Sequence, residues 1–128
     1  MKKEYKIIII GFLAITLFDI IGSITSSKFN YPYIDLWPIS LIIYISIPVF
    51  VTIASNFKTG MVAGSLLGFF DSTIGWKISM LLGANTFSAY INISNKQFAA
   101  MIIIVTLYST FVGLIASWLT IIFIKKNQ

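Results

Sequence analysis

The chain lacks several residue types on which much protein chemistry depends. Its 128 residues include no cysteine, no histidine and no arginine. The sequence therefore excludes disulfides, thiol nucleophiles, Ser-His-Asp triads, and zinc, iron or copper held by imidazole or thiolate ligands. We expect no cofactor and no metal site.

Charge is also scarce, because only 10% of the residues are charged whereas 58% are hydrophobic. A soluble domain usually has about a quarter of its residues charged. The apolar residues form long runs with lysines at their ends, which is typical of membrane spans anchored in the headgroup layer. The net charge of +5 therefore indicates the lipid bilayer as the environment and no nucleic-acid partner. The many Ile and Lys codons favour an AT-rich bacterial genome, and hence a bacterial cytoplasmic (inner) membrane.

The runs predict an all-α fold, a polytopic domain of four transmembrane helices that covers residues 1–128. The expected spans are about 7–24, 37–54, 60–82 and 98–124. A short turn joins the second span to the third, and a polar loop at 83–96 precedes the fourth. A basic start before an apolar run also fits a cleaved signal peptide, but Asp19 lies within this run and no Ala-x-Ala pattern follows it.

The lysines predict the orientation. With a cytoplasmic N-terminus, three lysines lie outside, and six lie inside: Lys2, Lys3, Lys6, Lys58, Lys125 and Lys126. This bias follows the positive-inside tendency. An even number of spans then places both termini in the cytoplasm.

Three ionisable residues fall within the predicted spans: Asp19, Asp71 and Lys77. Such residues cost a few kcal/mol in a bilayer unless they face protein or water, so they are candidates for a function. At 1.5 Å per residue, both aspartates lie about 16–18 Å from the cytoplasmic edge, near the midplane. Lys77 lies nearer the outer surface and can snorkel to it.

Helical spacing places Thr16, Ser23 and Ser26 on the same side as Asp19. This polar stripe faces either a partner helix or a wet cavity. Because burial disfavours a charged carboxylate, a carboxyl there can exchange a proton, as a coupled transporter requires. The alternative is a neutral or Lys-paired aspartate that only ties helices together.

Small residues recur every four positions in two neighbouring spans, as in a glycine zipper. Gly60, Gly64 and Gly68 lead to Gly75 in the third span, and the fourth span has Ser109, Gly113 and Ser117. Small residues let helix backbones approach closely, and this drives association in lipid. We expect this face to pack against the fourth span or against a second copy, which gives a homo-oligomer or a complex with a larger membrane protein.

Three short motifs carry a family resemblance over about half of the chain. They are Asp19-Ile20-Ile21-Gly22 in the first span, Leu36-Trp37-Pro38-Ile39-Ser40 at the start of the second, and Thr59-Gly60 at the third. In these motifs the chain resembles the small multidrug resistance transporters. The resemblance implies an antiparallel dimer in which first-helix acids bind protons or cationic drugs in turn. The chain departs from that family in having Asp rather than Glu as the acid, and Gly68-Phe69-Phe70-Asp71 where a Trp-x-Gly pattern is typical.

These features favour a proton- or cation-coupled transporter or channel that uses Asp19, with Asp71 as a second candidate. The alternative is a non-catalytic subunit that binds another membrane protein through its glycine face. A third hypothesis is an intramembrane aspartyl hydrolase with Asp19 and Asp71 as its dyad. The chain has no Gly-x-Gly-Asp motif, and we expect that it is not an enzyme.

Overall fold

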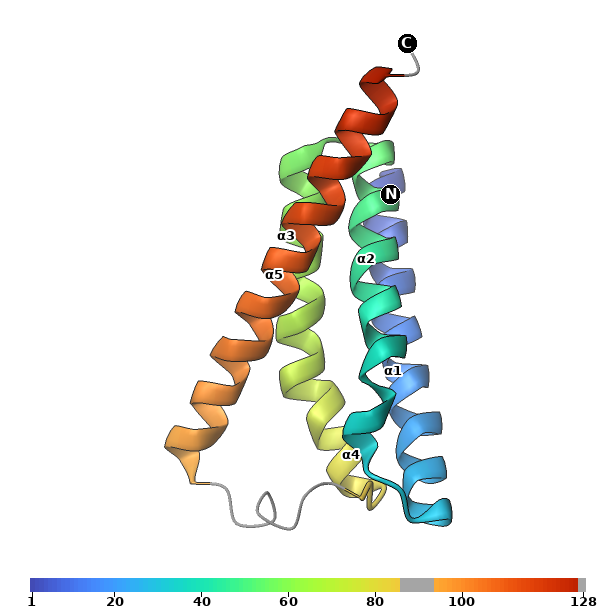
Figure 1. Ribbon diagram of the computed structural model, residues 1–128, viewed down its shortest axis with the longest axis vertical. Helices are drawn as coiled ribbons and strands as arrows, with labels where there is room; N and C mark the ends of the chain where they lie inside the picture. Colours follow the sequence, from blue (N-terminus) through green and yellow to red (C-terminus); the bar gives the residue numbers. More distant parts are fainter. Residues whose placement is uncertain (86–93, 127–128) are drawn as a thin grey trace.

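The computed structural model describes residues 1–85 and 94–126, and every regular element in these two ranges is helical. The elements, in chain order, are α1 (Lys3–Phe29), η1 (Tyr33–Leu36), α2 (Trp37–Ala54), α3 (Phe57–Phe70), η2 (Asp71–Gly75), α4 (Trp76–Leu81) and α5 (Asn95–Lys126). Figure 1 shows both termini at the same end of the molecule. The all-α expectation is confirmed in the described ranges.

Three helical stretches are long and apolar enough to cross a membrane: Lys3–Phe29, Tyr33–Ala54 and Asn95–Ile124. They coincide with the first, second and fourth predicted spans. The third predicted span, 60–82, falls on α3, η2 and α4, none of which reaches that length alone. η2 is a π-helical turn, in which the hydrogen-bond spacing widens from i+4 to i+5.

The observed helix ends differ from the predicted ones for local reasons. α1 continues past residue 24 to Phe29 and ends at Asn30, which has a φ of 54°. Asparagine tolerates this left-handed conformation better than most residues. α5 begins at Asn95, three residues before its predicted start. Most of the predicted polar loop at 83–96, namely residues 86–93, falls outside the described residues.

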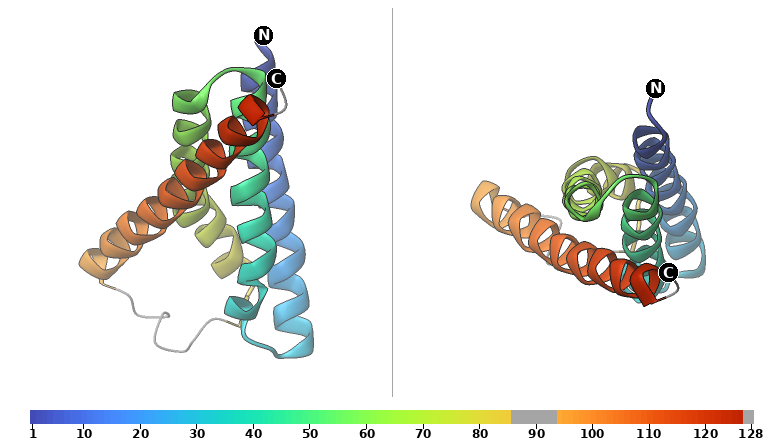
Figure 2. Two further views of the ribbon diagram at one scale, coloured as in Figure 1. Left: turned by 45° about the horizontal axis from the view of Figure 1, so that its top comes forward. Right: turned by 90° about the horizontal axis from the view of Figure 1, so that it is seen from above.

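The helices pack around a small core shared by α1, α2 and α3, which includes Ile15, Val51 and Leu67, each with no exposed surface. Most other large apolar side chains point outward, for example Leu13 and Ile42. This outward apolar surface fits an environment of lipid. α5 crosses α2 and α3 obliquely, and its N-terminal end stands away from the other helices (Figures 1 and 2).

The small residues of α3 and α5 lie against each other within the chain. A Cβ on Gly64 would be 3.0 Å from Gly113 Cα and 3.0 Å from Ser109 O, and the Pro48 ring of α2 lies beside both glycines. A Cβ on Gly60 would instead meet two side-chain oxygens, Thr52 Oγ1 of α2 and Ser117 Oγ of α5. Backbone therefore meets backbone where Gly64 crosses Gly113, and α5 covers the glycine face of α3.

Candidate functional site

Asp19 is buried on α1 with only 2% of its surface exposed. Tyr33 of η1 donates its hydroxyl hydrogen to Asp19 Oδ1 at 2.7 Å. Asp19 Oδ2 is buried without a hydrogen-bond partner among the described residues. The carboxyl group is therefore held at one oxygen, and its second oxygen is free to accept a proton or to bind a ligand.

Asp71 is the first residue of η2, where the helix changes its hydrogen-bond spacing. Tyr44, which is buried on α2, donates its hydroxyl hydrogen to Asp71 Oδ2. Each acid is thus oriented by one tyrosine hydroxyl, that of Tyr33 on η1 for Asp19 and that of Tyr44 on α2 for Asp71. Single π-helical turns within α-helices often occur at functional sites.

The two carboxyl groups meet at Gly75. A Cβ atom on Gly75 would lie within 3.0 Å of both Asp19 Oδ2 and Asp71 Oδ1. These two oxygens are therefore separated by no more than twice that distance. Glycine is required here because any side chain would occupy the space into which both carboxyl groups project. The structure brings together two acids that are far apart in the sequence.

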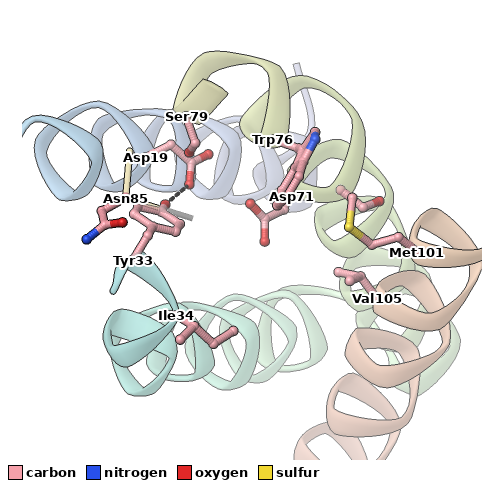
Figure 3. Close-up of a pocket in the computed structure, with 10 residues that line it drawn as sticks. Asp19, Tyr33, Ile34, Asp71, Trp76, Ser79, Asn85, Met101 and Val105 are labelled. Carbon is pink, nitrogen blue, oxygen red and sulfur yellow. Dashed lines mark hydrogen bonds between the residues drawn. The ribbon is translucent and has the colours of Figure 1, made fainter. Parts of the chain in front are cut away.

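The acids line a cavity of about 310 Å³. Its lining comes from α1, η1, η2, α4, the Asn85 turn and α5: Asp19, Tyr33, Ile34, Asp71, Ser72, Trp76, Ser79, Asn85, Met101 and Val105. Figure 3 shows the carboxyl groups of Asp19 and Asp71 on one side of this space and Met101 and Val105 on another. The cavity therefore has an acidic wall and an apolar wall.

Asn85 closes the end of the cavity that lies near the α1–α2 connection. Its backbone carbonyl accepts from Tyr33 N at 2.9 Å, and its backbone N–H donates to Ser26 Oγ at 3.1 Å. The Asn85 side-chain amide donates to Asn30 Oδ1 at 3.2 Å. These bonds tie the turn after α4 to both ends of the α1–α2 connection, which keeps Tyr33 above Asp19.

The polar stripe predicted beside Asp19 has three different environments. Thr16 donates to the Phe12 carbonyl, one turn earlier on α1, at 2.9 Å. Ser26 donates to the Tyr31 carbonyl at 2.7 Å. Ser23 is fully buried, and its hydroxyl has no partner among the described residues. Thr16 and Ser26 therefore satisfy the backbone, whereas Ser23 adds an unpaired hydroxyl one turn from Asp19.

Lys77 and Gly75 are the remaining candidate residues of this part of the third predicted span. Lys77 is exposed on α4 and does not line the cavity. Gly75 was placed by its spacing with the helix-packing residues, but it faces the two acids. No group of three or more His, Cys, Asp or Glu side chains that could hold a metal ion occurs in residues 1–85 and 94–126.

Sequence reasoning did not identify Tyr33, Tyr44, Trp76 or Asn85 as site residues. Tyr33 directly precedes the second apolar run, where tyrosine is common at the membrane interface and gives no signal of contact with an acid. Tyr44 had a detectable signal, because it is the only tyrosine between residues 37 and 54 and a mid-span hydroxyl needs a partner. Asn85 had no detectable signal in the sequence, since its role depends on contacts with residues more than 50 positions away.

Comparison of the chain with protein-family models, with curated proteins and with solved structures found no match. The carboxyl pair and the cavity are therefore the features that bear on its function.

Proposed function

We propose that this chain is a multi-pass protein of the bacterial cytoplasmic membrane that moves protons, or another monovalent cation, across the bilayer with Asp19 and Asp71 as the exchanging groups. The observation that carries this proposal is the convergence of two carboxyl groups on one cavity, that of the buried Asp19 and that of the partly buried Asp71. Intramembrane acids that face a cavity are typical of ion pathways and proton relays.

The topology needed for this function has four crossings. α3, η2 and α4 follow one another without a break, and together they are about as long as α1. We take them as one interrupted span, so the C-terminal end of α4 and the N-terminal end of α5 lie on the outer side, as the α1–α2 connection does. The common end of the two termini (Figure 1) supports this arrangement, and the lysine bias assigns that end to the cytoplasm.

The electrostatics of the pair explain why it would bind a cation. Two carboxylates this close together cannot both stay ionised in a low-dielectric site without a compensating positive charge. A proton on one of them, or a monovalent cation between them, removes most of that repulsion. Entry of one cation can then displace the proton, and this exchange is the elementary step of coupled transport.

Both acids of the pair come from one chain. The resemblance to the small multidrug resistance transporters implies acids from two copies in a dimer, whereas here Asp71 takes the place of the second acid. A homo-oligomer is still part of the proposal, because four short helices enclose little space. Both carboxyl groups of the proposed site, however, belong to one protomer.

The alternative of an accessory subunit relied on the glycine face. α5 covers Gly64 and Gly68. A helix of another protein therefore cannot pack closely against these two glycines while α5 stays in place. Purification in mild detergent separates the two functions. If only copies of this chain are recovered, the result supports the transporter. Recovery of a larger protein in stoichiometric amount would support the accessory-subunit hypothesis.

The test is proton flux into liposomes that contain a trapped pH dye, driven by a potassium diffusion potential. Asp19→Asn and Asp71→Asn should each reduce the flux to the level of empty liposomes, because a carboxamide does not bind or release a proton near neutral pH. Asp35→Asn is the control, since Asp35 is exposed on η1. Unchanged flux in both cavity variants would refute the proposal.

The same pair would be required for the third hypothesis, an aspartyl hydrolase, in which two carboxyls share a proton and activate water. An apolar peptide substrate in detergent distinguishes it. Cleavage that is lost in both Asp→Asn variants would establish a hydrolase, whereas flux without cleavage supports the transporter.

A further inference from the structure

A second groove lies between α1 and α3, at the end of the molecule where the chain begins. Its volume is about 430 Å³. Ile8 and Ile9 line it from α1, and Val62 and Leu66 from α3. Tyr5 and Lys58 lie at its terminal end. It shares no residue with the carboxyl cavity, so the inference drawn from it does not depend on transport.

The groove has the shape of an acyl-chain site. α1 and α3 run in the same direction from this end of the molecule (Figure 1). From Lys58 to Leu66 the groove follows α3 for about 12 Å at 1.5 Å per residue. That length is most of one leaflet of a hydrocarbon core about 30 Å thick. Ile9, Val62 and Leu66 are each more than 40% exposed, so an alkyl chain can reach this surface from the bilayer.

The charge at the mouth of the groove selects the headgroup. Lys58 is exposed there, and Lys2, Lys3 and Lys6 flank Tyr5 in the chain. Glu4 is the one acid in this part of the sequence. The N-terminus of α3 adds a partial positive charge at Lys58. A phosphodiester with net negative charge is attracted here, whereas a zwitterionic headgroup gains much less.

We propose that this groove binds one anionic phospholipid of the cytoplasmic leaflet, with its phosphate at Lys58 and one acyl chain along Ile9, Val62 and Leu66. The contact of an ammonium with a phosphate is a charge-assisted hydrogen bond. The bound lipid fills the space between two helices that make few contacts with each other. It therefore ties α1 to α3 at this end of the molecule.

The experiment measures the motionally restricted fraction of spin-labelled lipids around the full-length protein reconstituted in phosphatidylcholine. Labelled phosphatidylglycerol should associate more strongly than labelled phosphatidylcholine. Lys58→Gln should reduce that preference about fivefold, which corresponds to about 1 kcal/mol for one basic residue near an anionic lipid. Lys28→Gln, at the other end of α1, is the matched control and should leave the preference unchanged.

A second variant tests the groove itself. Val62→Trp places a large ring over its floor and should also remove the preference, while all lysines stay in place. Soluble glycerol phosphate should not compete, because it lacks the acyl chain. Equal association of the two labelled lipids with the unmodified protein would overturn the proposal. So would a preference that survives Lys58→Gln, or one that Lys28→Gln weakens equally.

Discussion

Tyr33 and Asp19 are 14 residues apart in the chain, yet the Tyr33 hydroxyl donates a 2.7 Å hydrogen bond to Asp19 Oδ1. This bond joins the α1–α2 connection to a buried acid on α1. It also leaves Oδ2 as the oxygen that faces Gly75 and Asp71. The orientation of the Asp19 carboxyl group, and hence the geometry of the pair, depends on it.

Tyr33→Phe should lower the free energy of unfolding by about 1–2 kcal/mol, because a buried carboxyl oxygen loses its donor. It should also reduce proton flux, since Asp19 is no longer oriented toward the cavity. Thermal unfolding in detergent measures the first effect, and the liposome assay measures the second. Tyr108→Phe, at an exposed position on α5, is the control. Full flux in Tyr33→Phe would show that this orientation is unimportant.

Asp19→Asn and Asp71→Asn should not have additive effects on stability. Groups this close usually show coupling of about 0.5–3 kcal/mol in a double-mutant cycle, whereas distant pairs add within about 0.5 kcal/mol. Neutralising either acid relieves the repulsion felt by the other. The second substitution therefore raises the free energy of unfolding by less than the first. A cycle of Asp71→Asn with Asp35→Asn supplies the comparison and should be additive. Additivity in both cycles would mean that the two acids do not interact.

Gly75→Ala should destabilise the protein by about 1–3 kcal/mol, as overpacking usually does, and should abolish flux. The added methyl would lie within 3.0 Å of a carboxyl oxygen from each acid, so the pair must separate. Gly11→Ala is the matched substitution. Its methyl would lie 3.0 Å from the apolar side chains of Ile47 and Leu67, a longer approach than at Gly75 and to no carboxyl oxygen, so its effect should be smaller and flux should persist. Normal flux in Gly75→Ala would contradict the proposed pair.

Gly64→Leu should unfold the chain rather than release a partner. Its side chain would have to enter the contact with Gly113 Cα and Ser109 O, and backbone atoms cannot move aside without separating α3 from α5. Val62→Leu, at an exposed position on the same helix, should be tolerated. Thermal unfolding and size-exclusion chromatography are measured together. A folded Gly64→Leu variant that has lost a co-purifying protein would restore the subunit hypothesis.

Much of the architecture could be predicted from local patterns. Apolar runs between lysines predicted the helices, because burial in lipid depends on composition over about 20 residues and not on contacts elsewhere in the chain. The division of the third span at Asp71–Gly75 had no such signal. A π-helical turn depends on packing that averaged hydropathy does not record.

Composition and residue order suffice to predict that this protein is helical and apolar and that acids occur in its apolar runs, because the free energy of transfer into lipid is a property of each residue. The packing of the helices is what brings Asp19 and Asp71 to one cavity, sets Tyr33 and Tyr44 against them, and places Gly75 where it leaves space between them. Equal depth in two helices does not specify which way either side chain turns. That depends on helix rotation, which packing across the whole bundle sets.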